Sequence, residues 1–321
     1  MTATLPEELR EVFDRFITTE YVTIDGRGQP IAWPVTPYHD TAAGCIDVTT
    51  GIGYPKKADD AARNPQVALL FSDPTGSGLT GAPMVLVQGT AVVDERDMKA
   101  NRERYDREGT IKLPAAQKGA PPKFLRGMFA WYYDRIYVHV RPERVFVWPN
   151  GDPAVEPTLY GAHVEEVRSG HDELPDEPHA EPEGGSPAWD ERMDAIGSRT
   201  YPTAVVSLVS PDGFPFAVRV PVRPDRDNNV VRIDGECVGT PWQPGLACLT
   251  VHDHDPEFTW QRNFQVRGDL VADEHGWKLA PHKLVGGFEL PPGSLLSRMR
   301  LNAQKVKRFR RIARERQAAR R

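Results

Sequence analysis

Two adjacent lysines, Lys56 and Lys57, begin a predicted short helix over residues 56–62. A predicted strand ends just before them in Thr49 and Thr50, and the loop between contains two glycines. A phosphate group carries close to two negative charges, which lysines, hydroxyls and a helix N-terminus can all stabilise. An isolated lysine pair usually lies on a solvated helix surface, but the order of strand, threonines, glycine loop and basic helix favours a phosphate site.

The elements that must position this segment are short strands with few helices. Apolar residues recur at helical spacing in some segments and alternate in others. We expect helices over 5–16, 56–62, 98–107 and 122–134, and strands over 21–24, 30–38, 45–50, 67–71, 84–94, 136–140 and 144–148. Seven strands with so few helices indicate a small barrel rather than a large α/β enzyme.

The second half of the chain repeats the first in a weaker form. Four segments recur in one order: 21–35 in 205–222, 65–73 in 244–253, 85–95 in 264–274, and 141–151 in 281–293. Four weak matches in the same order are hard to obtain by chance, so they predict a tandem duplication. The second copy has no Lys or Arg between Arg232 and Arg262, so we expect that it has lost the phosphate site.

The segment from Cys45 to Phe71, CIDVTTGIGYPKKADDAARNPQVALLF, resembles the FMN-binding split barrel of the pyridoxamine 5'-phosphate oxidase-like superfamily. Family members end a strand in Thr, continue into a basic pair followed by Ala, and then carry Asn-Pro-x-Val and an apolar strand. The matching residues are Thr49, Thr50, Lys56, Lys57, Ala58, Asn64, Pro65, Val67 and Leu69 to Phe71. A later strand with a central Gly89 and a closing segment from Glu143 to Gly151 extend the likeness over nearly all of the first 151 residues.

The resemblance implies a fold and a cofactor. It implies a mainly β protein with helices, built as two tandem split β-barrels with a degenerate second copy. It further implies a flavin-dependent oxidoreductase that binds FMN through Thr49, Thr50, Lys56 and Lys57 and transfers hydride to or from a small organic substrate. Trp148 matches the aromatic residue expected over the flavin, and the strand that holds Trp33 matches the first cofactor-side strand. No catalytic side chain is identified.

The sequence also departs from the family. The oxidase proper has an Arg in the strand of Trp33, and its closing Trp is followed by an Arg and a His that hold pyridoxine phosphate. Here Trp148 is followed by PNGD, so we do not expect the vitamin B6 enzyme. A deazaflavin-dependent reductase remains an alternative, with a basic wall of Lys112, Lys118, Lys123 and Arg126 for its polyglutamate tail. So does a non-catalytic haem- or flavin-binding protein, with His139 or His163 as an axial ligand.

Family members dimerise around the flavin, so the duplication implies a pseudo-dimer within one chain and leaves a homodimer of such chains open. One cofactor would then lie between the two barrels, near Trp242, Trp260, His252 or His254. The His-Asp-His-Asp run at 252–255 is interpreted as a polar strand end, because successive residues of a strand face opposite ways. No metal site is predicted.

We expect four regions: a split barrel over 1–151, an acidic Pro-rich linker over 152–187, a second barrel over 188–293 and a basic helix over 294–321. Residues 152–191, which include the linker, hold twelve Asp and Glu, whereas 297–321 holds eleven Lys and Arg. The helix could pack on the barrels, dock on the linker, or bind nucleic acid or anionic lipid. Packing is the more common outcome, and nucleic-acid binding is not expected.

The bulk composition agrees with a small-molecule enzyme of the cytoplasm. The 321 residues are 39% hydrophobic and 26% charged, with no apolar run near the roughly 20 residues that span a bilayer. The N-terminal segment lacks the basic start and apolar core of a secretory signal. Three scattered cysteines suit a reducing compartment and form no disulfide framework.

Overall fold

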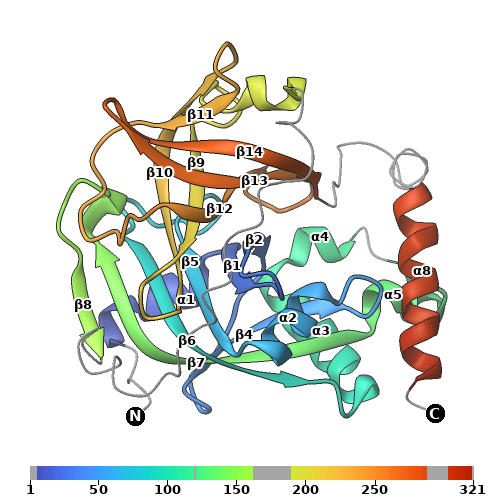
Figure 1. Ribbon diagram of the computed structural model, residues 1–321. Helices are drawn as coiled ribbons and strands as arrows, with labels where there is room; N and C mark the ends of the chain where they lie inside the picture. The colour runs from blue at the N-terminus through green and yellow to red at the C-terminus, as the bar shows by residue number, and fades with distance from the viewer. Residues whose placement is uncertain (1–5, 119–120, 162–188, 288–302, 320–321) are drawn as a thin grey trace.

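A computed structural model describes residues 6–118, 121–161, 189–287 and 303–319 of the chain, and two antiparallel β structures dominate it (Figure 1). The first is a curled sheet in the order β2-β1-β5-β6-β7-β4-β3, with β8 paired to β7. Its strands are β1 (Thr19–Ile24), β2 (Pro30–Val35), β3 (Tyr38–Asp40), β4 (Cys45–Gly51), β5 (Gln66–Phe71), β6 (Met84–Asp94), β7 (Arg135–Trp148) and β8 (Thr158–Gly161).

The second structure is a closed barrel in the order β10-β11-β14-β13-β12-β9. Its strands are β9 (Thr203–Val209), β10 (Pro215–Asp225), β11 (Val230–Ile233), β12 (Gly245–His254), β13 (Gln261–Asp273) and β14 (Gly276–Gly286). A 3-10 segment, η4 (Glu191–Ala195), precedes it where a short helix was expected.

The two structures share one strand order. Followed from β10 in the other direction, the barrel has the order β10-β9-β12-β13-β14-β11. These strands correspond in turn to β2, β1, β5, β6, β7 and β4 of the first sheet. The difference lies at the closure: β10 pairs with both β9 and β11, whereas the first copy divides the equivalent strand into β2 and β3 around Pro37. Proline lacks a backbone N–H, which explains an interruption there. The predicted fold class, mainly β in two tandem copies, is confirmed.

The structure differs from the expected elements at β7, which is one continuous strand rather than two. Pro142, the residue that suggested a break, lies opposite Gly89, where a β-bulge shifts the register between Gln88 and Gly89. Proline has no N–H to donate, but a bulge already interrupts the regular hydrogen bonds between the two strands at this position. The strand can therefore continue through Pro142. In addition, β8 pairs with β7 and extends the first sheet beyond residue 151 into the expected linker. The rest of that linker, including His163, lies outside the described residues.

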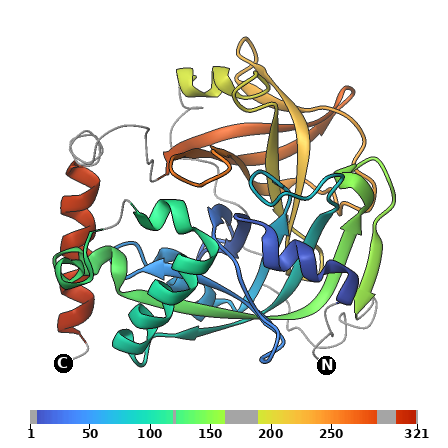
Figure 2. The ribbon, with the colours of Figure 1, turned by 180° about the vertical axis from the view of Figure 1, so that it is seen from behind.

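Short helices and the C-terminal helix lie against the first sheet (Figure 2). They are η1 (Glu7–Leu9), α1 (Arg10–Arg15), α2 (Lys56–Arg63), α3 (Met98–Lys112), α4 (Pro114–Lys118), η2 (Lys123–Phe129), α5 (Ala130–Tyr133) and the C-terminal α8 (Ala303–Ala318), with η3 (Pro149–Gly151) after β7. Val306, Phe309 and Ala313 of α8 join the apolar core of the first sheet. The basic helix therefore packs on the protein, the first of its three expected roles. None of the described helices is long and apolar enough to cross a membrane.

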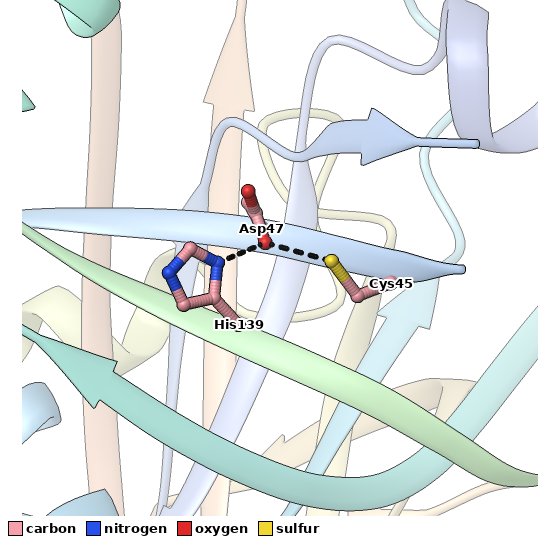
Figure 3. Close-up of side chains that lie close together, drawn as sticks. All are labelled: Cys45, Asp47 and His139. Atoms are coloured by element: carbon pink, nitrogen blue, oxygen red, sulfur yellow. Dashed lines mark hydrogen bonds and ion pairs between the residues drawn. The ribbon is translucent and has the colours of Figure 1, made fainter. Parts of the chain in front are cut away.

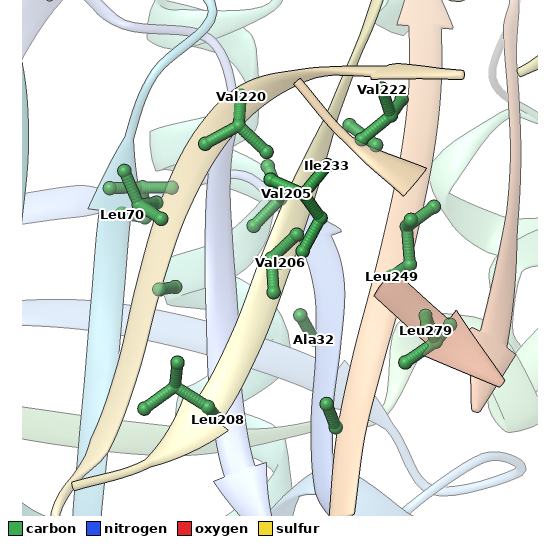
Figure 4. Packing of buried hydrophobic residues seen from close by; sticks show 14 of the residues in the cluster. Ala32, Leu70, Val205, Val206, Leu208, Val220, Val222, Ile233, Leu249 and Leu279 are labelled. Carbon is green, nitrogen blue, oxygen red and sulfur yellow. The ribbon is translucent and has the colours of Figure 1, made fainter. Parts of the chain in front are cut away.

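The two sheets share a second apolar core between them. Figure 4 shows Ala32 and Leu70 of the first sheet packed among side chains of the barrel such as Val206 and Leu249. These four side chains are fully or almost fully buried. Burial of this kind stabilises folding by about 25 cal/mol for each Å² of apolar surface, so the two copies hold each other in a fixed arrangement.

Candidate functional site

The predicted phosphate segment brings two cations together at one end of the first sheet. Lys57, at the start of α2, lies with its Nζ 5.9 Å from the ring centroid of Tyr54. The guanidinium of Arg135, the first residue of β7, lies 6.0 Å from the same centroid. Burial and the nearby guanidinium lower the pKa of Lys57 to about 8. Arg135 was not predicted from the sequence. It joins the site because β7 pairs with β4, which places Arg135 opposite Gly51.

Tyrosines surround the guanidinium of Arg135. It donates hydrogen bonds to the hydroxyls of Tyr54 (2.8 Å) and Tyr105 (2.6 Å) and lies 4.0 Å from the ring centroid of Tyr105 and 4.2 Å from that of Tyr132. Its buried Nε has no hydrogen-bond partner in the described part of the chain. Among the described residues no carboxylate pairs with Arg135 or Lys57. A buried cation normally has a counterion, so this pair is suited to an anion that the protein itself does not supply.

Lys56 differs from its neighbour because it is already neutralised. Its Nζ lies 2.9 Å from Asp60 and 3.7 Å from Asp25, and half of its side chain is exposed. The Asp60 pair is the familiar i,i+4 contact of a helix surface. The structure therefore places Lys57, rather than both lysines, in the unpaired cationic site.

The threonines and glycines of the loop have internal roles. Thr50 is buried and its hydroxyl donates to the Tyr54 carbonyl (2.8 Å), which fixes the turn after β4, while Thr49 is partly exposed in β4 opposite Tyr137. A Cβ at Gly51 would lie 2.7 Å from the Trp131 carbonyl oxygen, and one at Gly53 would lie 2.8 Å from that of Phe309. These glycines admit α5 and α8, so close packing explains them without a phosphate.

The two predicted tryptophans lie elsewhere. Trp148 ends β7 and Arg135 begins it, so a straight strand would separate them by roughly 40 Å, at about 3.4 Å per residue. Figure 1 shows β7 crossing the whole first sheet between β8 and α5. Trp33 lies in β2, partly exposed, opposite Tyr21 of β1. Arg135, beside Lys57, and Trp148 therefore lie at opposite ends of β7.

Trp148 instead packs against the second copy, at the loop that corresponds to the lysine-bearing loop of the first copy. Its Nε1 donates to the carbonyl of Val238 (3.2 Å), in the loop before β12, and its ring lies edge-on to Phe216 at 6.1 Å. Trp148 is completely buried in the core that the two copies share. This position explains how a loop without lysines remains ordered against the first sheet.

Two of the four residues proposed for the deazaflavin tail, Lys112 and Arg126, already have partners. Arg126 is buried, pairs with Asp106 and stacks on Tyr133, and the Lys112 Nζ donates to the carbonyls of Phe13 and Asp14. A continuous basic wall including Arg126 is therefore not free for a polyglutamate tail.

His139, the candidate haem ligand, belongs to a hydrogen-bonded trio (Figure 3). Its Nδ1 lies 2.7 Å from Asp47, whose same oxygen accepts from the Cys45 thiol at 3.2 Å. Burial and the Asp47 charge raise the pKa of Cys45 to about 12, so this thiol is not a nucleophile at neutral pH. Because Asp47 separates Cys45 from His139, the trio lacks the direct contact between nucleophile and base that catalysis requires.

The contact between the two copies contains a network of buried charges. Arg144 of β7 forms an ion pair with Asp212 of the barrel, and both side chains are almost completely buried. Arg219 of β10 donates to the Glu20 carboxylate of β1 at 2.8 Å, and His252 also contacts Glu20. Trp242 and Trp260 do not join this network: Trp242 stacks on Trp277, and Trp260 lies near Arg262.

No family model and no curated protein matches the sequence. Solved structures match about half of the chain. One is a protein of the pyridoxinephosphate oxidase family from Clostridium acetobutylicum, related to general stress protein 26, with 13% identity, 50% of this chain and 94% of that chain covered, and a TM-score of 0.33. Another, an F420 reductase, has 19% identity, coverages of 44% and 98%, and a TM-score of 0.32. HutZ, the haem storage protein from Vibrio cholerae, has 19% identity, coverages of 45% and 94%, and a TM-score of 0.32.

Proposed function

We propose that the chain is a flavin-dependent oxidoreductase that binds the phosphate of FMN at Lys57 and Arg135. The observation that carries this proposal is the pair of cations with no carboxylate partner among the described residues, at the end of the segment that resembles the FMN-binding split barrel. Bound FMN would supply hydride transfer at its ring. A deazaflavin coenzyme, which is also a phosphate ester, is the second candidate for the same cations.

The residues of the chain would act on the phosphate end. Lys57 would provide an ammonium charge, and the N-terminus of α2 adds the favourable end of its dipole. Arg135 is held in place by the hydroxyls of Tyr54 and Tyr105, so its position would not need to reorganise when an anion binds. The surrounding tyrosine rings exclude water and strengthen each charge interaction.

The arrangement of the two copies supports a pseudo-dimer with one functional phosphate site. The first copy keeps the cations, whereas Trp148 occupies the corresponding loop of the second. We propose one flavin per chain on this basis, with a small organic molecule as the substrate.

Adjacent lysines provide a matched test. Lys57→Met should weaken FMN binding by roughly 10- to 100-fold, the size of one charge-assisted hydrogen bond. Lys56→Met, one residue away and already paired with Asp60, should change it by much less. Both are measured by the quenching of flavin fluorescence.

Riboflavin, which lacks the phosphate, gives the second arm. Its affinity should be the same for the wild type and the Lys57→Met variant. The proposal fails if Lys57→Met leaves FMN affinity unchanged, or if it weakens FMN and riboflavin equally.

A further inference from the structure

A cavity of about 290 Å³ opens where the two copies meet, far from the cationic site. Its lining comes from both copies and includes Ser72, Asp73, Tyr201, Thr203, Arg219 and His252. Asp73 follows β5 of the first sheet, and His252 belongs to β12 of the barrel. The wall of this cavity therefore combines a carboxylate and an imidazole from segments distant in the sequence.

His254 joins these two residues because it lies two positions after His252 on the same strand. Residues i and i+2 of a strand face the same side, and the two imidazole rings lie parallel within 4° at 6.3 Å. Successive residues of a strand face opposite ways, but His252 and His254 are two positions apart, so the prediction of no metal site overlooked this pair. Asp73 could not be found from the sequence, because only the packing of the two copies brings it close.

The three side chains direct ligand atoms to one point. The Asp73 Oδ2 lies 3.7 Å from the His252 Nδ1 and 3.6 Å from the His254 Nε2. The three ligand atoms all lie within 4.8 Å of one another. Ligands of a tetrahedral zinc ion at about 2.1 Å are separated by about 3.4 Å, so the three side chains would draw together to bind one ion.

The other polar atom of each ligand is already held. The His252 Nε2 contacts the Glu20 carboxylate, and the His254 Nδ1 donates to the Asp255 carbonyl at 2.9 Å. The second oxygen of Asp73 accepts the Thr75 N–H at 3.0 Å. Outer partners of this kind fix the tautomer and orientation of metal ligands.

One ligand atom lacks any other explanation. The side chain of His252 is almost completely buried, and its Nδ1 has no hydrogen-bond partner among the described residues. The His254 Nε2, besides its contact with Asp73, lies 3.2 Å from the Thr18 hydroxyl. The nearby Arg219 lies on the opposite side of the His252 ring and is balanced by Glu20.

We propose that Asp73, His252 and His254 form a site for one divalent transition metal ion, such as Zn²⁺. Two imidazoles and one carboxylate are the ligand set of open zinc and iron sites, in which a further position is left for water or substrate. The adjoining cavity supplies that position. The competing state is a proton shared between His252 and Asp73.

The test uses the full chain after chelator treatment. Titration with Zn²⁺ by calorimetry should give one equivalent per chain, and Co²⁺ should give visible absorption bands of a site with nitrogen ligands. Asp73→Asn and His254→Gln should each weaken binding at least about tenfold, which is the loss that even outer-partner changes produce.

His275→Gln is the matched control, because the His275 side chain is exposed and its imidazole pairs with Glu274. It should bind Zn²⁺ as the wild type does. Circular dichroism without metal establishes that each variant is folded. The proposal is overturned if the wild type takes up no Zn²⁺ or Co²⁺, or if folded Asp73→Asn and His254→Gln bind them as tightly as His275→Gln.

Discussion

Gly89 and Gly268 occupy the same position in the two copies. Each lies at a β-bulge, Gly89 opposite β7 and Gly268 opposite β14. A Cβ at Gly89 would lie 2.1 Å from the carbonyl oxygen of Arg141, and one at Gly268 would lie 2.0 Å from that of Ala280. In both copies the residue after that carbonyl is a proline. Apolar strands recur in unrelated barrels, whereas a shared irregularity with the same glycine and proline indicates a common origin of the two halves.

Alanine at either bulge should therefore destabilise the protein. Gly89→Ala and Gly268→Ala would each force backbone atoms apart, which costs about 1–3 kcal/mol in packed interiors. Urea unfolding followed by circular dichroism would measure the loss. Gly127→Ala serves as the control, since a Cβ there meets no atom within 4 Å. Equal stability of all three variants would contradict the role assigned to the bulges.

The positions of most strands and the duplication could be predicted from the sequence because they depend on local patterns. Alternating strands, turn residues and the four repeated segments are all visible in a linear reading. The continuous β7 was missed because proline cannot donate a hydrogen bond to a neighbouring strand. It is tolerated inside a strand where a bulge interrupts the regular pairing, and the sequence did not reveal that bulge.

The site was only partly predictable, since it depends on which partners the fold brings near each charge. Lys56 and Lys57 are identical in type, and only the positions of Asp25 and Asp60 distinguish them. Arg135 lies 78 positions after Lys57 in the chain and joins it through strand pairing. Trp148 was assigned to the flavin by resemblance, but the packing of the two copies buries it against the second barrel.

The ion pair of Arg144 and Asp212 should be important for holding the two copies together. Each side chain is at most 3% exposed, so Asp212→Asn would leave a buried guanidinium without its counterion. Breaking a buried pair in this way costs about 3–5 kcal/mol. We expect a lower urea midpoint for Asp212→Asn. Asp227→Asn, a variant of a carboxylate on the turn after β10, should unfold as the wild type does, and a shift of equal size there would contradict the assignment.

The hydrogen bond that His139 donates to the Asp47 carboxylate raises the pKa of His139 above its ordinary value of 6.5. A histidine whose folded pKa is raised contributes stability that is fully present below 6.5 and is lost as the pH rises through the folded pKa. The difference in unfolding free energy between the wild type and His139→Gln should therefore shrink as the pH rises above 6.5. Urea titrations at several pH values would measure it. A difference that grows with pH would show that His139 is neutral in the folded protein.

Lys57 should make FMN binding depend on pH in the alkaline range. With its pKa lowered to about 8, the free site loses this charge at a pH where an unperturbed lysine would still be protonated. An anion stabilises the ammonium form, so binding takes up a proton above that pH and FMN affinity should fall as the pH rises. Lys57→Arg, which stays charged throughout, should bind FMN with much less dependence on pH. Fluorescence titrations of both proteins between about pH 7 and pH 10 would separate this effect from titration of the flavin itself, which both proteins share. If the two affinities fall in parallel, Lys57 does not contact the phosphate.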